Sequence, residues 1–246
     1  MFLYTYLYND SKVVYIDDSK VNNIEDNDLN SAQNGEEVTS TPTDKALQME
    51  TNLYSKYGKM KVDDINFNEL KEVNGDVVAW LIVDGTSINY PIVQTVDNDY
   101  YLNHNIKKEI KVSGWTFMDF RNSKEMSDSN TIFYGHNLLN KTGFGSLSNV
   151  FTDKWFKSSN HRIIVVTENK RYVYEVFSCY SIEPEIYYLS NNFNNNSEYK
   201  KFLDTLVDRS NYKFNVNLDA NDKIITLSTC TDDNKGRKVV HAKLIG

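Results

Sequence analysis

The chain has 246 residues, enough for one domain of about 200 residues with an extension. Its formal net charge of −7 gives no electrostatic support for nucleic-acid binding, which requires the neutralisation of phosphates. With two cysteines, Cys179 and Cys230, the sequence excludes a disulfide framework and a cysteine-rich metal site.

The chain begins with a polar, acidic stretch. Residues 17–50 hold nine Asp and Glu against two Lys, so this stretch alone carries a net charge of −7. It has few large apolar residues, and we expect residues 1–43 to form a flexible linker. Residues 1–8 are apolar but far shorter than the ~20 residues of a membrane-spanning helix, and they lack the basic region and cleavage site of a signal peptide.

Two short helices are expected next. Residues 44–57 have apolar side chains at approximately helical spacing. A second helix over residues 64–73 would turn Ile65, Leu70 and Val73 toward a core.

Eight runs rich in β-branched and aromatic residues, bounded by turn signals, predict strands. They cover residues 77–83, 87–94, 113–118, 130–134, 162–167, 171–180, 223–229 and 237–245. An amphipathic helix, residues 198–209, precedes the last two strands. With few helices and no regular alternation of strand and helix, the pattern predicts a mainly β protein folded as a closed, antiparallel-rich barrel.

The two cysteines have different surroundings. Cys179 shares one face of its strand with Val173 and Phe177, and we interpret it as a core residue; a disulfide between Cys179 and Cys230 is the alternative. Cys230 lies among Ser, Thr and Asp at the end of a strand, and Arg237 begins the next one. A neighbouring arginine lowers the pKa of a thiol, whereas a buried structural thiol is the commoner fate of cysteine, so the local sequence leaves both interpretations open.

The run Thr226-Leu-Ser-Thr-Cys230, followed by an arginine at the start of the next strand, resembles the active-site signature of the sortases, the cysteine transpeptidases of bacterial surfaces. The ending Arg237-Lys-Val-Val-His-Ala-Lys-Leu is similar to the class B branch. The resemblance extends to residues 74–83, 88–94 and 99–104. It implies a sortase-like closed eight-stranded β-barrel, residues 76–246, with an N-terminal helical extension, residues 44–75, and together these form the catalytic domain.

His136, in Tyr134-Gly-His136-Asn, follows a short apolar strand and precedes a glycine-containing loop, which is a favourable place for exposure. From the residues alone, a loop histidine without a role is the alternative. The catalytic histidine of sortases has a similar Gly-His-Asn context, so the resemblance assigns this role to His136. The other histidines, His104, His161 and His241, are weaker candidates.

The resemblance implies a nucleophile at Cys230, a general acid at His136 and an oxyanion or substrate stabiliser at Arg237. A thiolate is a strong nucleophile, an imidazolium protonates a leaving amine near neutral pH, and a guanidinium stabilises developing negative charge. No cofactor and no metal is expected. The adjacent Asp232 and Asp233 could orient His136 or bind a cation, although such a pair is more often a solvated turn.

By resemblance, the enzyme would cleave a C-terminal sorting signal after Thr and transfer the surface protein to an amine of a peptidoglycan precursor. Substrate binding is expected at Asn98, Leu102, Tyr187, Tyr188 and Ser228. The expected location is the extracellular face of a Gram-positive membrane, with an N-terminal anchor that this sequence does not make evident. Two alternatives are a pilus-assembling sortase that joins pilins through Lys and a binding module without catalysis.

Removal of residues 1–43 should leave peptide cleavage unchanged, because their composition lacks the apolar side chains that would offset the entropy of ordering them. Limited proteolysis should stop near Asp44, and turnover before and after trimming provides the measurement. A loss of activity on trimming would show instead that the segment packs on the barrel.

Overall fold

The structure is a computed structural model that describes residues 2–3, 16–17, 53–54, 56–158 and 160–246. The chain divides into two units, residues 1–53 and 54–246. In the first unit, β1 (Phe2–Leu3) pairs antiparallel with β2 (Ile16–Asp17). The expected boundary at residues 43 and 44, and most of the expected helix over 44–57, lie outside the described residues; residues 53–54 and 56–58 are helical.

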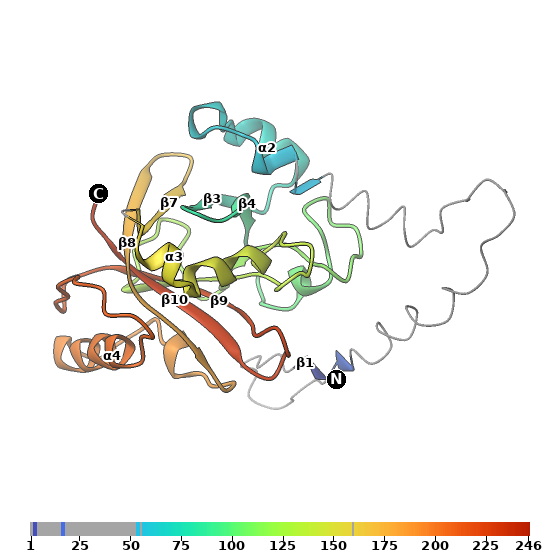
Figure 1. The fold of residues 1–246 in the computed structure, drawn as a ribbon. Helices are drawn as coiled ribbons and strands as arrows, with labels where there is room; N and C mark the ends of the chain where they lie inside the picture. Colours follow the sequence, from blue (N-terminus) through green and yellow to red (C-terminus); the bar gives the residue numbers. More distant parts are fainter. Residues whose placement is uncertain (1, 4–15, 18–52, 55, 159) are drawn as a thin grey trace, which may run out of the picture. The chain divides into compact units, whose positions relative to one another are not determined.

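The second unit is built on a closed barrel with the strand order β10-β8-β7-β3-β4-β5-β6-β9 (Figure 1). Its strands are β3 (Val77–Val83), β4 (Asn89–Val93), β5 (Phe117–Met118), β6 (Asn130–Tyr134), β7 (Arg162–Val166), β8 (Arg171–Ile182), β9 (Ile224–Cys230) and β10 (Arg237–Leu244). All neighbours are antiparallel except β4 with β5 and β6 with β9, which are parallel. The predicted eight-stranded barrel is confirmed.

The expected strand over residues 113–118 is wrong for residues 113–116, since β5 is only two residues long. Gly114 has a φ of +55°, a left-handed conformation that does not continue a strand. The amide of the next residue, Trp115, donates to the carbonyl of Tyr101 instead of to a barrel strand.

A short helix, α2 (Phe67–Val73), precedes the barrel and begins at the N-cap Asn66, whose side chain accepts hydrogen bonds from the amides of Asn68 and Glu69. The helix buries Phe67 and Leu70. The expectation that Val73 faces a core is wrong, because this side chain is 42% exposed. Three residues along an α-helix turn by about 300°, so the Val73 side chain points about 60° away from that of Leu70 and lies outside the buried face of the helix.

The predicted helix before the last two strands is present as α4 (Asn196–Asp208), capped by Asn195. It buries an apolar face against strand residues. This cluster comprises Phe177, Tyr180, Tyr188, Tyr199, Phe202, Leu203, Leu206, Ile224 and Val239.

The shorter helices are η3 (Val62–Asp64), η4 (Tyr100–Leu102), η5 (Gly145–Phe151), α3 (Asp153–Phe156) and η6 (Tyr187–Leu189). Among the described residues, none of the helices has the length and apolar character to cross a membrane.

Cys179 is fully buried in β8, as expected for a core residue. Burial raises the pKa of its thiol to about 12, so it stays protonated at neutral pH. The structure has no disulfide between Cys179 and Cys230, which excludes that alternative.

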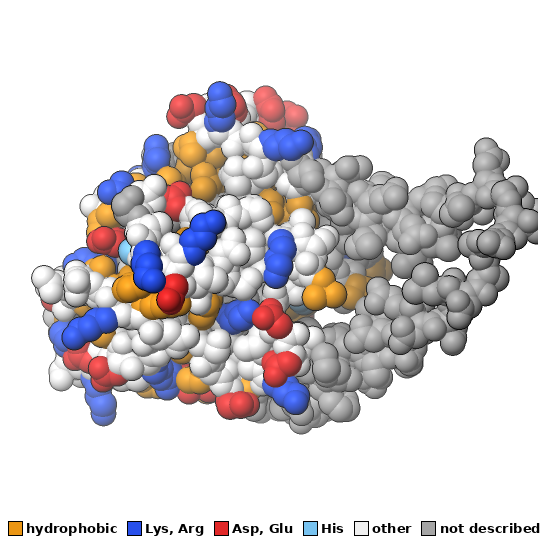
Figure 2. Space-filling view, in the orientation of Figure 1, with side chains coloured by type: hydrophobic (Ala, Val, Ile, Leu, Met, Phe, Trp, Pro, Cys, Tyr) orange, Lys and Arg blue, Asp and Glu red, His pale blue; other side chains and the backbone are white. Residues whose placement is uncertain are grey.

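On the face drawn in Figure 2, positive and negative side chains are interspersed.

The substitution Leu203→Ala should destabilise the protein by about 2–5 kcal/mol, because it removes a fully buried side chain from the contact between α4 and the barrel. Urea unfolding measures the loss. Val207→Ala in the same helix is the matched control, since Val207 is 42% exposed and its truncation should change stability by no more than about 0.5 kcal/mol. Equal losses in the two variants would contradict the packing of α4 described here.

Candidate active site

The parallel pairing of β6 with β9 brings His136 and Cys230 to the same end of the barrel. Tyr134, the last residue of β6, lies opposite Ser228 of β9. His136 and Cys230 each follow this pair by two residues. Because the carboxyl ends of parallel neighbours lie at the same edge of a sheet, the imidazole and the thiol come from adjacent positions on that edge.

The antiparallel pairing of β9 with β10 adds Arg237 to this edge. Arg237 and Cys230 are direct cross-strand partners, so their side chains lie on the same face. The connecting turn is closed by hydrogen bonds from the Thr231 amide to the Gly236 carbonyl (3.0 Å) and from the Gly236 amide to the Thr231 hydroxyl (2.9 Å). The turn therefore holds the backbones of Arg237 and Cys230 opposite each other, with both side chains on one face.

The ring of His136 is oriented by a backbone carbonyl. Its Nε2 lies 2.8 Å from the carbonyl oxygen of Leu102, at the end of η4. A carbonyl oxygen only accepts hydrogen bonds, so Nε2 carries a hydrogen in this geometry. In the neutral ring Nδ1 is then the basic nitrogen, and it is the atom that takes up or releases a proton.

Cys230, His136 and Arg237 are all partly accessible to solvent. Cys230 differs in this from Cys179, which is fully buried. The edge therefore combines a thiol, an imidazole and a guanidinium within reach of a substrate in solution. Such a set can support covalent catalysis with proton transfer and stabilisation of an oxyanion.

Comparisons with known proteins identify the family. The model of the sortase domain matches residues 81–245. Sortase B of Listeria monocytogenes is 38% identical over 180 residues, which cover 72% of this chain and 73% of that protein. The chain belongs to the class B sortases. Sortases of this class are cysteine transpeptidases, so the protein is an enzyme and the alternative of a binding module without catalysis is excluded.

Solved structures agree with this assignment. A mutant form of Clostridium perfringens sortase B superposes with a TM-score of 0.73 at 33% identity, over 81% of this chain and 98% of that one. A sortase B complexed with triglycine has a TM-score of 0.74 at 32% identity, over 80% of this chain and 98% of that one.

Two residues expected to bind substrate lie close to Cys230 in this sortase but are buried. Ser228 is on the same face of β9, two residues before Cys230, and its hydroxyl is 3.0 Å from the hydroxyl of Tyr188 in η6. Burial raises the pKa of Tyr188, while the Ser228 hydroxyl and the charge of Arg237 act in the opposite direction. The neighbouring Tyr187 is exposed at the surface.

The other two expected residues, Asn98 and Leu102, lie on the connection between β4 and β5. Leu102 contributes the carbonyl that binds His136. The side chain of Asn98 is held at both ends: its Nδ2 donates to Asp119 (3.2 Å) and its Oδ1 accepts from the amide of Phe120 (3.0 Å). The structure thus separates the five residues into two segments, 98–102 and 187–190, and one strand position, Ser228.

An ion pair between the buried Asp119 and the more exposed Arg121, which directly follow β5, was not predicted from the sequence. Burial alone would raise the pKa of Asp119, but the hydrogen bonds and charge of Arg121, with the Tyr134 hydroxyl, hold it below its ordinary value. The available signal was an Asp and an Arg two residues apart at the end of a strand, a spacing that also occurs in solvated turns.

Asp232 links the loops that follow Cys230 and His136 in this sortase. Its carboxylate accepts from Lys238 Nζ at 2.8 and 2.9 Å and from Asn137 Nδ2 at 2.9 Å. Hydrogen bonds from Lys238 and Asn137 lower the pKa of Asp232. Asp232 thus binds the residue next to His136, whereas Asp233 caps the turn by accepting from the amide of Lys235.

The other three histidines make structural contacts. His104 Nδ1 bonds to the carbonyl of Tyr100, and His161 Nε2 to the carbonyl of Phe156. His241 is fully buried, and burial lowers its pKa to about 3. The buried His241 therefore stays neutral in the folded protein at neutral pH.

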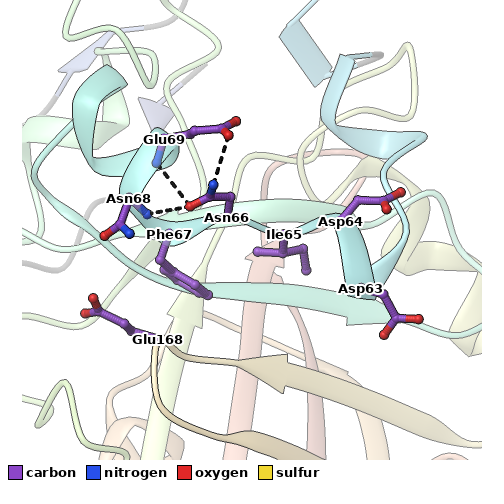
Figure 3. A pocket seen from close by; sticks show the side chains of 8 residues that line it. All are labelled: Asp63, Asp64, Ile65, Asn66, Phe67, Asn68, Glu69 and Glu168. Atoms are coloured by element: carbon purple, nitrogen blue, oxygen red, sulfur yellow. Dashed lines mark hydrogen bonds between the residues drawn. The ribbon is translucent and has the colours of Figure 1, made fainter.

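A recess of about 580 Å³ lies beside η3 and α2 and next to Glu168 of the β7–β8 turn (Figure 3). Its lining does not include Cys230, His136 or Arg237. It carries four carboxylates, and Figure 3 shows Asp63, Asp64, Glu69 and Glu168 pointing in different directions around it. Among the described residues there is no cluster of three or more His, Cys, Asp or Glu side chains suited to a metal ion.

The substitution Gly114→Ala should both destabilise this sortase and slow its turnover. A Cβ at Gly114 would lie 2.3 Å from the carbonyl oxygen of Tyr101 and 2.7 Å from that of Leu102, the group that orients His136. We expect a loss of more than about 1 kcal/mol in the free energy of unfolding, because φ is positive and the clashing atoms are backbone.

Gly75→Ala is the matched control for this variant, since a Cβ there has no atom within 4 Å. Its stability should stay within about 1 kcal/mol of the original, with turnover unchanged. Full turnover in Gly114→Ala would show that the position of the Leu102 carbonyl does not matter for His136.

Proposed function

We propose that this class B sortase cleaves a C-terminal sorting signal after its Thr and transfers the surface protein to a cell-wall amine. The observation that carries the proposal is the cross-strand pairing of Cys230 with Arg237 at the edge where β6 delivers His136. The proposed reaction has two halves, formation of a thioacyl-enzyme and its aminolysis.

In the first half, the Cys230 thiolate attacks the carbonyl carbon of the substrate Thr. A carbon–sulfur bond forms while the carbonyl π electrons move to oxygen, and the Arg237 guanidinium stabilises the resulting oxyanion. The carbon–nitrogen bond then breaks, and the leaving amine takes a proton from Nδ1 of His136. The products of this half are a thioester at Cys230 and the released C-terminal peptide.

In the second half, the acceptor amine attacks the thioester carbonyl and Nδ1 of His136 takes its proton. The carbon–sulfur bond breaks and returns the thiolate. The hydrogen bond between Nε2 of His136 and the Leu102 carbonyl supports this role, because it keeps Nδ1 as the nitrogen that exchanges protons in both halves.

The proposed acceptor is the amine of a peptidoglycan precursor, and the proposed donors are surface proteins that carry the sorting signal. The relatives from Gram-positive bacteria and the sortase B complexed with triglycine support an amine acceptor and a cell-surface location. We place the catalytic domain at residues 44–246, with residues 1–43 as a linker toward a membrane anchor.

Substrate binding is proposed for the segment that carries Asn98 and Leu102 and for the segment that carries Tyr187 and Tyr188. Tyr187 is exposed, so its ring can touch the sorting signal directly. Ser228 and Tyr188 are buried and bonded to each other, so they would act by shaping the surface beside Cys230.

The substitution Cys230→Ala should abolish peptide cleavage and leave the fold intact, because the thiol is the proposed nucleophile and lies at a partly accessible strand end. The measurement is mass analysis of a sorting-signal peptide incubated with each protein and an amine, together with a circular dichroism melt. Turnover by the alanine variant would contradict the mechanism, whereas gross unfolding would support a structural cysteine.

Arg237→Lys should be nearly as damaging as Arg237→Ala, because lysine keeps the charge but loses the planar fork that holds an oxyanion and a backbone carbonyl together. Arg237 Nη1 already donates to the Gly236 carbonyl at 3.0 Å, which orients the fork. Each variant should lose about 100- to 1,000-fold in kcat, measured on one sorting-signal peptide. A lysine variant within a few-fold of the original would leave only a distant electrostatic role.

A further inference from the structure

The buried carboxylate of Asp119 is the centre of a polar cluster next to the proposed active site. The residue is fully buried. Its Oδ1 accepts from the Arg121 amide and from Arg121 Nε, both at 2.9 Å. Its Oδ2 accepts from Arg121 Nη2 (2.7 Å), Tyr134 hydroxyl (2.8 Å) and Asn98 Nδ2 (3.2 Å). A carboxylate has about four lone-pair sites, so Asp119 is saturated within the protein.

Two of these partners lead to the proposed catalytic machinery. Asn98 begins the segment 98–102, which ends at the Leu102 carbonyl that binds His136. Tyr134 is the last residue of β6 and precedes His136 by two residues. Asp119 thus fixes both chain segments that determine the place of the imidazole.

Arg121 extends the cluster to the other substrate-binding segment. While its Nε and Nη2 bind Asp119, Nη2 also donates to the carbonyl of Leu189 at 3.1 Å. Leu189 follows Tyr187 and Tyr188 in η6. A single ion pair therefore connects segment 98–102, through Asn98, with segment 187–190, through Leu189.

Stability alone does not explain a charged pair at this place. Only the Asp119 carboxylate is removed from water, since the Arg121 side chain remains partly exposed. Burying a carboxylate carries a desolvation cost, and a well-packed apolar residue of similar volume often gives a protein of equal or greater stability. What apolar side chains cannot supply is directional bonding to an amide, a phenol and a carbonyl at once. The arrangement is therefore suited to fixing positions.

We propose that Asp119 and Arg121 are positioning residues that set the spacing between segments 98–102 and 187–190 and thereby the affinity of this sortase for the sorting signal. The proposal rests on the proposed function, because that function makes the two segments a substrate-binding surface. Neither residue is assigned contact with the reacting atoms.

The test compares Asp119→Asn, Arg121→Lys and Arg121→Gln with the original chain. Arg121→Lys retains the charge but cannot bind Asp119 through two nitrogens and reach the Leu189 carbonyl together. Three quantities are measured: kcat and KM for one sorting-signal peptide, the rate of Cys230 alkylation by iodoacetamide from pH 5 to 9, and amide hydrogen exchange of residues 186–192.

The matched control is Asp222→Asn. Asp222 forms an ion pair of 2.9 Å with Lys243, and both side chains are partly buried. Lys243 lies near the end of β10, whereas Arg237 begins that strand, so this pair is at the far end of the barrel from Cys230. The control should lower the melting temperature without changing KM.

We expect the two Arg121 variants to raise KM by about tenfold or more, with kcat and the pH profile of alkylation within about twofold of the original. Asp119→Asn should raise KM as well and also lower kcat, because Asp119 holds the two segments that place His136. Exchange in residues 186–192 should accelerate in these variants and stay unchanged in Asp222→Asn. A purely structural role of Arg121 would instead lower the melting temperature, kcat and the alkylation rate together in the two Arg121 variants. If Asp119→Asn does not fold, the two Arg121 variants carry the test.

Unchanged KM and unchanged exchange in both Arg121 variants would overturn the proposal, as would an equal rise of KM in Asp222→Asn. Failure of the proposed function has a different signature, because the original chain would then not cleave the peptide at all. In that case hydrogen exchange still decides whether Arg121 holds segment 187–190.

Discussion

The parallel pairing of β6 with β9 is the constraint on which the rest of the site depends. The two strands are far apart in the sequence, and their register sets His136 and Cys230 level with each other. Side chains alternate between faces along a strand, so a slip of one residue would turn one of the two to the opposite face. The antiparallel partner β10 then needs only the short turn 231–236 to add Arg237 to the same edge.

A chain of buried hydrogen bonds fastens the η6 segment to these strands. Asn130 donates to the carbonyls of Ser190 (2.9 Å) and Tyr188 (3.3 Å) and accepts from the Thr226 hydroxyl (2.7 Å). Because the single hydroxyl hydrogen of Thr226 is used there, its oxygen accepts from His241 Nδ1 at 2.9 Å, and Nε2 of the neutral ring accepts from the Tyr180 hydroxyl at 3.0 Å. Fully satisfied buried networks of this kind rigidify the elements that they join.

The sequence was sufficient to predict those strands and site motifs in which the local residue pattern agrees with the fold. The strands β6, β9 and β10 have the periodicity and flanking turns that the structure shows, and the motifs around His136 and Cys230 indicated the family. The parallel pairing of β6 and β9 was not predictable, since alternation is the same for parallel and antiparallel neighbours. The Asp119–Arg121 pair was missed for a related reason: its partners Asn98, Tyr134 and Leu189 come from three separate segments.

Because β5 is short, few residue pairs close the barrel between β4 and β6. Only one residue pair, Val93 with Phe117, joins β5 to β4, and two pairs join it to β6. Side-chain bonds reinforce this side, because Gln94 Nε2 donates to the carbonyls of Asp119 and Asn122, both at 2.8 Å. Proteins open first where few backbone bonds would have to break. Local opening of this barrel should therefore start between β4 and β6. A partly opened molecule would expose the inner face of the sheet there, while β8, β9 and β10 remain paired.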